Sequence, residues 1–181
     1  MNLDNNIVIG NRIPKDFFIT KGVGESDITT HAGSFHLALK NAGIEKANII
    51  QYSSILPKIA TEIQDYNITH GEVMETIMAV SNGMLGERLT AGIIFGWLFD
   101  KKTGEKIGGL VSEENGNYPE DVISERLKQS LQEIYENGFS DKYRLKIEKI
   151  IVETFVPEKQ YGSAIVAICF VNYVYPVVGP A

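Results

Sequence analysis

Two adjacent serines, Ser53 and Ser54, stand inside the run Ile-Ile-Gln-Tyr-Ser-Ser-Ile-Leu-Pro of residues 49–57. Strand interiors seldom carry such a pair, and serine hydroxyls at a strand end ordinarily bond to nearby backbone. A hydrolase nucleophile would need a base and a sharp turn, but the chain has no Gly-x-Ser-x-Gly motif. A Ser-His-Asp triad cannot be assigned from the sequence either. Hydrolase chemistry is therefore disfavoured.

A serine in this setting can also be the precursor of a carbonyl group. The hydroxyl of a strained X-Ser bond attacks the preceding carbonyl, and β-elimination from the resulting ester releases the upstream chain. The dehydroalanine that remains hydrolyses to a pyruvoyl group. Such a group forms a Schiff base with an amino acid and accepts the electrons released as carbon dioxide leaves, the role that pyridoxal phosphate has elsewhere. A turn that strains the scissile bond favours the first step.

The composition indicates one globular domain over residues 1–181, with 44% hydrophobic and 22% charged residues. A net charge of -6 disfavours a nucleic-acid partner. The single cysteine, Cys169, excludes an internal disulfide framework and lies in an apolar run, which predicts burial. We expect no secretory signal, no membrane span and a cytoplasmic location, because no basic segment precedes an apolar one and no apolar run approaches about 18 residues.

Histidines offer no metal-site pattern. His31, His36 and His70 lack the His-Glu-x-x-His type of spacing, so we expect no metal. His70 opens the segment 70–79 and reads as structural. Glu75 in the same segment could face a pocket, but its side of the strand is left open by the sequence.

Hydrophobic periodicity predicts two helices among many strands. The clearest helix is 118–138, with Pro119 at its start, acidic residues in its first turn and Gly138 at its end. The other helix is 34–44, with a stop at 41–43. The expected extended segments are 16–26 running into a glycine turn, 47–57, 72–83, the hairpin 88–100 with 106–116, 143–156, and 162–176. This pattern predicts an α+β fold, an αββα sandwich of antiparallel sheets covered by helices.

The serine segment resembles the processing segment of the pyruvoyl-dependent arginine decarboxylases. The resemblance rests on residues 41–58, with Asn48 six residues before Ser54 and Ile-Leu-Pro after it. Residues 70–79 and 108–116 are similar to two strands of the family, and the segment Gly-Val-Gly-Glu-Ser-Asp at 22–27 is similar to its bacterial members. The resemblance covers about residues 19 to 173.

The resemblance implies the fold's chemistry and its site residues. Self-cleavage would fall between Ser53 and Ser54, giving a β chain of residues 1–53 and an α chain of residues 54–181 that begins with the pyruvoyl group. Asn48 matches an asparagine that assists processing, and Glu113 matches the glutamate that returns a proton after decarboxylation. Glu114 would point to the opposite face of the sheet. Ile55, directly after the pyruvoyl position, is a candidate substrate contact.

The implied cofactor is this covalent pyruvoyl group alone, with neither pyridoxal phosphate nor a metal. The resemblance also implies a homotrimer, or a dimer of trimers, with the active site between neighbouring subunits. The substrate would be a small molecule, an amino acid, most simply arginine giving agmatine.

One position departs from the family pattern. His36 stands where the family has an aspartate that pairs with the substrate guanidinium, and a neutral imidazole cannot make that bidentate pair. Either another acid, Asp27 or Glu25, supplies the contact, or the substrate is a different amino acid. A further alternative is a non-catalytic homologue, an oligomeric scaffold whose serines are never processed.

Overall fold

The structure is a computed structural model that describes residues 7–64 and 66–180. The described residues form one mixed α+β domain, mostly sheet with two α-helices, as the periodicity predicts. The elements in chain order are β1 (Ile7–Ile9), β2 (Ile13–Ser26), a π-helical turn (Thr30–Phe35), α1 (His36–Asn41), β3 (Asn48–Gln51), β4 (Ile55–Pro57), β5 (Thr61–Glu62), β6 (Val73–Met84), β7 (Leu89–Asp100), β8 (Lys106–Gly116), α2 (Glu120–Gly138), β9 (Tyr143–Phe155), β10 (Tyr161–Val174) and β11 (Val177–Pro180).

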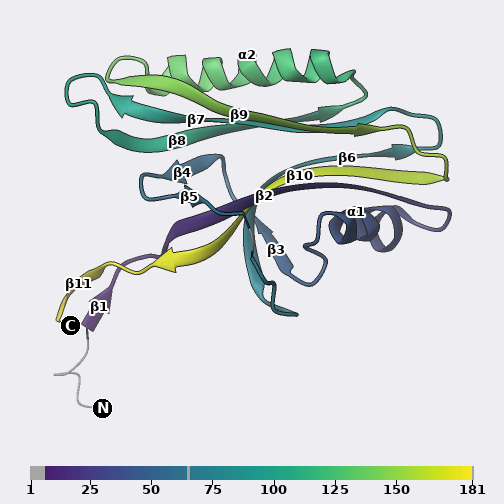
Figure 1. Cartoon of the computed structure of the whole chain (residues 1–181), viewed down its shortest axis with the longest axis horizontal. Helices are drawn as coiled ribbons and strands as arrows, with labels where there is room; N and C mark the ends of the chain where they lie inside the picture. Colours follow the sequence, from purple (N-terminus) through teal and green to yellow (C-terminus); the bar gives the residue numbers. More distant parts are fainter. Residues whose placement is uncertain (1–6, 65, 181) are drawn as a thin grey trace.

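Two larger sheets lie face to face (Figure 1). The five-stranded sheet has the order β3-β6-β10-β2-β5, and the four-stranded sheet has the order β4-β8-β7-β9. The expected hairpin of β7 with β8 is confirmed. Strands β9 and β10 follow one another in the chain but belong to different sheets. A small ribbon of β1 and β11 extends from one end of the body (Figure 1).

Alternation along the strands separates the cores. On β7, Ile93 and Phe95 face the space between the sheets, where they pack with Phe17 and Phe170. Ile94, with the opposite parity, packs under α2 against side chains that include Leu127 and Leu131. Helix α1 covers the outer face of the five-stranded sheet through Ala38, in a cluster that also holds the fully buried Cys169. Burial raises the pKa of the Cys169 thiol to about 12, so this thiol is a packing group.

The glycine turn predicted within the segment 16–26 was wrong. Gly22 and Gly24 lie inside β2, which continues to Ser26. A Cβ atom at Gly22 would lie 2.4 Å from the Ala38 carbonyl oxygen, and one at Gly24 would lie 2.2 Å from the Ser34 carbonyl oxygen. These glycines therefore admit the backbone of α1 and its preceding turn directly onto the sheet. The helix does stop at the predicted place, where Gly43 has a φ of +75°.

The expected extended segment 47–57 is not one strand, because it changes sheets. Strand β3 runs parallel to β6 in the five-stranded sheet and ends at Gln51. Strand β4 begins at Ile55 and pairs with β8 in the four-stranded sheet. The chain then returns to the five-stranded sheet as β5, parallel to β2. Residues 52–54 are thus the first of two crossings between the sheets.

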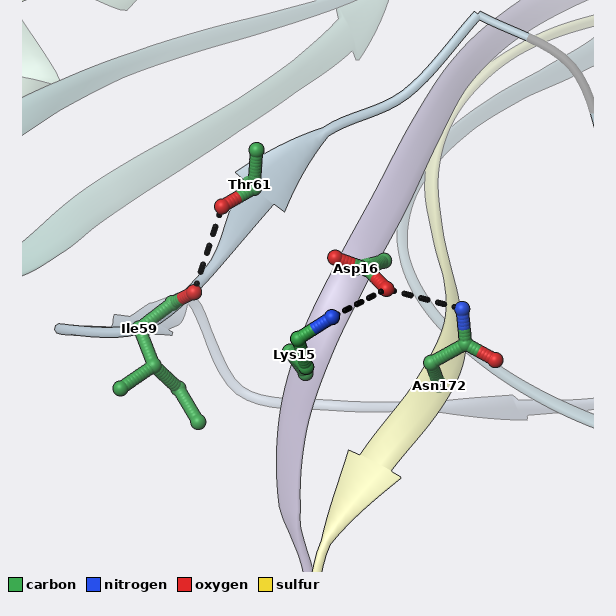
Figure 2. A network of polar contacts seen from close by, with 5 residues as sticks. All are labelled: Lys15, Asp16, Ile59, Thr61 and Asn172. Carbon is green, nitrogen blue, oxygen red and sulfur yellow. Dashed lines mark hydrogen bonds and ion pairs between the residues drawn. The ribbon is translucent and has the colours of Figure 1, made fainter.

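A polar network lies where the chain returns. Figure 2 shows Asp16 on β2 accepting hydrogen bonds from Lys15 Nζ at 3.1 Å and Asn172 Nδ2 at 2.8 Å, beside Thr61 of β5. The hydrogen bond from Asn172 is the main cause of a lowered pKa for the Asp16 carboxyl. This network joins β2 to β10 next to the short strand β5. It therefore lies where the segment that contains the serines and β4 rejoins the five-stranded sheet.

Candidate active site

The serine pair occupies a bend at the sheet crossing. The Ile55 N–H donates to the Ser53 carbonyl oxygen at 2.8 Å, which closes a tight three-residue turn around Ser54. The Val111 N–H of β8 donates to the Ser54 carbonyl oxygen at 3.0 Å. The Ser53 side chain is exposed, whereas Ser54 is half-buried. Both carbonyl groups of the serine pair therefore accept a hydrogen bond. That of Ser53 is bonded within the turn, and that of Ser54 is bonded to β8.

Glu113 is the side chain that the Ser54 hydroxyl contacts. Ser54 Oγ lies 2.8 Å from Glu113 Oε1 and 2.7 Å from Oε2, close enough to donate to either oxygen. Glu113 shares the inner face of β8 with Val111, a member of the core between the sheets. Burial raises the pKa of the Glu113 carboxyl, and the hydrogen bond from Ser54 partly opposes that shift. The carboxyl can therefore hold or release a proton closer to neutral pH than an exposed glutamate.

Glu114 lies on the other face of the sheet, as the alternation of a strand predicts. Its carboxylate accepts hydrogen bonds from Ser130 Oγ at 3.0 Å and from Arg126 Nε at 3.4 Å, both on α2. It therefore joins β8 to the covering helix and has no route to Ser54. Of the two neighbouring acids, only Glu113 is at the serine bend.

Asn48 does not reach the serines of its own chain. Its Nδ2 donates to the Gly71 carbonyl oxygen at 2.9 Å. Asn48 is the first residue of β3, and the three residue steps to Gln51 alone span roughly 10 Å. It lies instead in a cavity of about 600 Å³ between α1 and β3, together with His36. The remaining lining residues of this cavity are His31, Ala32, Phe35, Leu39, Ala47 and Ile49.

The two acids considered as substitutes for the missing aspartate lie elsewhere. Glu25 Oε2 accepts hydrogen bonds from the backbone of Glu158 and Lys159, and Asp27 Oδ1 accepts one from the backbone of Gln160. Both therefore tie the end of β2 to the loop between β9 and β10. Among the described residues, the lining of the His36 cavity includes neither of them. Whether either acid contacts a substrate in an assembly of several copies stays a prediction.

Two residues near the crossing escaped sequence reasoning. Glu75, whose face the sequence left open, is 1% exposed and pairs with Arg12, which lies just before β2. Parity was the available signal, because Glu75 alternates in step with Ile77 on β6, and Ile77 is in the core between the sheets. Arg12 gave no signal, since the contact spans 63 positions of the chain.

Comparison with known proteins places this chain in a family. The family model described as pyruvoyl-dependent arginine decarboxylase matches residues 16–175. The pyruvoyl-dependent arginine decarboxylase AaxB of Chlamydia pneumoniae is 32% identical over 187 residues, which cover 91% of this chain and 94% of that protein. The chain belongs to the pyruvoyl-dependent arginine decarboxylase family. A further member, named a probable pyruvoyl-dependent arginine decarboxylase, comes from Chlorobium luteolum and is 31% identical over 133 residues, 66% of this chain and 70% of that protein.

Family membership implies a pyruvoyl group, and the residues around Ser54 fit one. The hydrogen bond from Val111 goes to the carbonyl oxygen of Ser54, so it stays with the downstream chain after a cut before that residue. The Glu113 carboxyl already contacts the side chain of the residue that would become the group. Ser54 is half-buried rather than enclosed, which leaves an approach for a small substrate.

Among residues 7–64 and 66–180, His, Cys, Asp and Glu side chains do not gather in threes as a metal site would need. Within the same residues, neither helix combines the length and the apolar character needed to cross a bilayer.

Proposed function

We propose that this member of the pyruvoyl-dependent arginine decarboxylase family cleaves itself between Ser53 and Ser54 and then converts arginine to agmatine and carbon dioxide. One observation carries the proposal: at the sheet crossing, the hydroxyl of Ser54 contacts the Glu113 carboxylate next to a hydrogen-bonded Ser53 carbonyl. The products are a β chain of residues 1–53 and an α chain of residues 54–181. The order of layers, with α1 and α2 on the outer faces of two packed sheets, supports the αββα sandwich.

The first step is an acyl shift. Ser54 Oγ attacks the carbonyl carbon of Ser53 while its proton passes to Glu113, the only acceptor that this hydroxyl contacts among the described residues. The Ile55 N–H stabilises the negative charge that develops on the Ser53 oxygen, as an oxyanion-hole donor does. The carbon–nitrogen bond then breaks, the Ser54 nitrogen takes up a proton, and an ester links Ser53 to Ser54 Oγ.

The ester is next removed by elimination. The Cα proton of residue 54 leaves and the Cβ–Oγ bond breaks, which releases residues 1–53 with a free carboxylate. The dehydroalanine left at position 54 rearranges to an imine, and one water molecule replaces its nitrogen as ammonia. A ketone at the new N-terminus remains, so the whole sequence consumes one water and needs no oxidant.

Glu113 serves the decarboxylation as a proton donor. The pyruvoyl carbonyl, once formed, supplies an electrophile that condenses with the substrate amine and withdraws electrons as carbon dioxide leaves. The raised pKa of Glu113 favours its protonated form, and its position beside residue 54 lets it return a proton to the former α-carbon. Ile55, which is exposed next to this position, is the proposed substrate contact. Independence from pyridoxal phosphate and metals stays a prediction, as does a cytoplasmic location.

The proposed assembly is a homotrimer or a dimer of trimers, with the site completed by a neighbouring copy. Exposed apolar side chains support it. Ile55 on β4 is 53% exposed beside Ser54, and at the β3 edge of the other sheet Ile50 and Val73 are 47% and 57% exposed. Asn48 and His36 share a cavity away from the serines of their own chain. A neighbouring copy would bring that cavity to Ser54.

Ser54→Ala tests the function directly. We expect this variant to remain one chain on a denaturing gel and to be inactive, because the attacking oxygen is gone. Ser53→Ala is the matched control and should still be cleaved, because only the Ser53 carbonyl takes part. The wild type should give fragments with the masses of residues 1–53 and 54–181. A wild-type chain that stays whole would favour a non-catalytic scaffold.

The cavity favours a second candidate, decarboxylation of another amino acid. Its described lining has two histidines and an asparagine but no carboxylate. An unpaired guanidinium costs about 1.5–3 kcal/mol, or roughly tenfold to more than a hundredfold in affinity. If arginine is the substrate of an otherwise fitting pocket, His36→Asp should raise kcat/KM for arginine by that factor. A wild type that prefers an acidic amino acid over arginine would exclude the arginine assignment and leave the pyruvoyl chemistry in place.

A further inference from the structure

The Ser53–Ser54 peptide bond lies between the two sheets, and the residues on its two sides are hydrogen-bonded to different sheets. On the downstream side, Ser54 is bonded to β8 of the four-stranded sheet. On the upstream side, the Tyr52 N–H donates to the Thr76 carbonyl oxygen of β6 in the five-stranded sheet at 2.7 Å. Only Ser53 lies between these attachments. The position of the Ser53 carbonyl relative to Ser54 Oγ therefore depends on how firmly Tyr52 is held.

The side chain of Tyr52 is held by the core between the sheets. Its ring lies 5.8 Å from that of Phe170, centroid to centroid, with an angle of 38° between the ring planes. Phe170 on β10 is paired across the strands with Glu75 on β6, so the two side chains stand next to each other on the same face. Strand β3 pairs on the other side of β6, where Ile50 is opposite Glu75. Glu75 thus lies on the strand next to β3, the strand that leads into the serines.

Glu75 is a buried carboxylate that pairs with the exposed Arg12, and no step of the proposed chemistry uses this pair. Its Oε1 contacts Arg12 Nη2, and its Oε2 has no hydrogen-bond partner among the described residues. The Arg12 guanidinium carbon also lies 5.6 Å from the centroid of the Tyr173 ring. Arg12 and Tyr52 together line a second cavity, of about 320 Å³. The pair therefore connects the segment before β2 with β6, β10 and Tyr52.

Stability does not explain this pair. Two other residues of β6 on the same face, Ile77 and Ala79, are apolar members of the core. Burial of the Glu75 carboxylate carries a desolvation cost that offsets its attraction to Arg12, so replacing both charges together by apolar side chains is often close to neutral. A buried ion pair does differ from an apolar contact in being directional, since its two partners must keep one mutual orientation. We therefore expect the Arg12–Glu75 pair to fix the positions of the side chains around it.

We propose that Arg12 and Glu75 are positioning residues for self-cleavage, which act through Tyr52 to hold the Ser53 carbonyl in front of Ser54 Oγ. This inference rests on the self-cleavage proposed above. Neither residue touches the reacting atoms, so their effect is on the rate at which the bond is cut. They should have little effect on the chemistry of a chain that has already been cut.

The test follows cleavage of newly made protein. Each chain is synthesised in a cell-free reaction with a short radioactive pulse, and its conversion to the two fragments is timed on a denaturing gel. The main variant is Arg12→Met with Glu75→Met, which leaves no unpaired charge and keeps the stem of residue 12 over the Tyr173 ring. The control replaces the exposed pair Lys149–Glu62, joined at 2.7 Å, by methionines in the same way.

We expect the Arg12/Glu75 variant to melt within about 4 °C of the wild type and to be cleaved about tenfold to a hundredfold more slowly, because a misplacement of about 1 Å is enough for such a loss. Turnover per Ser54-derived carbonyl, titrated with a hydrazide reagent, should stay within about twofold of wild type in the cleaved fraction. The control variant should be cleaved at the wild-type rate. A folded Arg12/Glu75 variant that is cleaved as fast as wild type would overturn the proposal.

A second comparison covers the case in which the double variant does not fold. Tyr52→Leu removes the ring contact with Phe170, whereas Tyr52→Phe keeps it. Slow cleavage of the leucine variant with normal cleavage of the phenylalanine variant supports the anchor, and normal cleavage of both overturns it. Failure of the proposed function is distinguishable, because then the wild type and the Lys149–Glu62 control also remain uncut.

Discussion

Glu113 and Glu114 are neighbours in the chain with opposite surroundings. Glu113 faces Ser54, and Glu114 faces Ser130 and Arg126 on α2. Glu113→Gln should lower carbon dioxide release per Ser54-derived carbonyl on the order of a hundred- to ten-thousand-fold, because the proton donor is lost. Its self-cleavage should also slow, because Glu113 is the proposed proton acceptor of the acyl shift. Glu114→Gln should leave turnover nearly unchanged and reduce stability by about 1 kcal/mol, the worth of one such hydrogen bond. Steady-state carbon dioxide release and thermal unfolding of both variants separate these effects, and exchanged phenotypes would contradict the assignment.

Glu113 also predicts a dependence of stability on pH. Burial raises its pKa in the folded chain above the ordinary value of 4.5, so the folded state holds the proton more tightly than the unfolded state. Well below pH 4.5 both states are protonated and the group has no effect. As the pH rises through that value and through the raised pKa, the folded state loses stability relative to the unfolded one.

The comparison is best made in chains that cannot be cleaved. We expect Ser54→Ala with Glu113→Gln to melt at a higher temperature than Ser54→Ala alone at neutral pH, with a difference that disappears below about pH 4. Removal of Ser54 also removes the hydrogen bond that opposes the raised pKa, so the direction stands in this background. A difference of the same size at every pH would show that Glu113 titrates normally.

At the scale of elements, two glycines of β2 decide how closely α1 approaches the sheet. A side chain at Gly22 or Gly24 would overlap the backbone of α1 or its preceding turn. Gly22→Ala and Gly24→Ala should each destabilise the fold by about 1–3 kcal/mol or more, because backbone cannot shift as a flexible side chain can. Thermal unfolding measures this loss. Gly138→Ala is the matched control, with no atom within 4 Å of the added Cβ, and should change little.

Those glycines also show why local patterns misread this region. A glycine pair in a chain read by itself indicates a turn. Here both glycines serve a contact with residues 34–42, and that contact exists only once α1 is placed. By contrast, α2 was readable from its own residues, because Pro119, the first-turn acids Glu120 and Asp121, and the buried Ile123, Leu127 and Leu131 all favour the same helix.

At the scale of the whole molecule, the proposed shared site can be tested by mixing two defective chains. Asn48→Ala lacks the processing amide, and Ser54→Ala lacks the nucleophile. If a neighbouring copy supplies Asn48, co-expression should let Asn48→Ala chains be cleaved where a Ser54→Ala chain lies beside them. Tags of different mass on the two chains make the fragments distinguishable on a denaturing gel. If Asn48→Ala chains stay whole in assemblies proven to be mixed, Asn48 does not act on the serines of a neighbouring copy. It would then act within its own chain or take no part in cleavage.

The sequence by itself determined the α+β class, the hairpin of β7 with β8, the helix α2 and the family. Each of these depends on a local pattern or on a short segment such as the one around Ser54. Local patterns and short segments consist of residues that are close together in the chain, so they can be recognised without the structure. The sequence also indicated Ser54 and Glu113 as site residues. That prediction came from the family resemblance, because the spacing of the two residues in the chain does not by itself suggest a contact.

Only the tertiary structure decided what surrounds the serines. That the chain changes sheets at residues 52–54, that Glu75 is buried against Arg12, and that Asn48 lies in the cavity with His36 all depend on contacts between distant segments. A strand pattern states which side chains alternate, but it does not state which sheet the strand joins or what packs on each face. Those are set when the two sheets close over their common core, and that closure involves the whole chain at once.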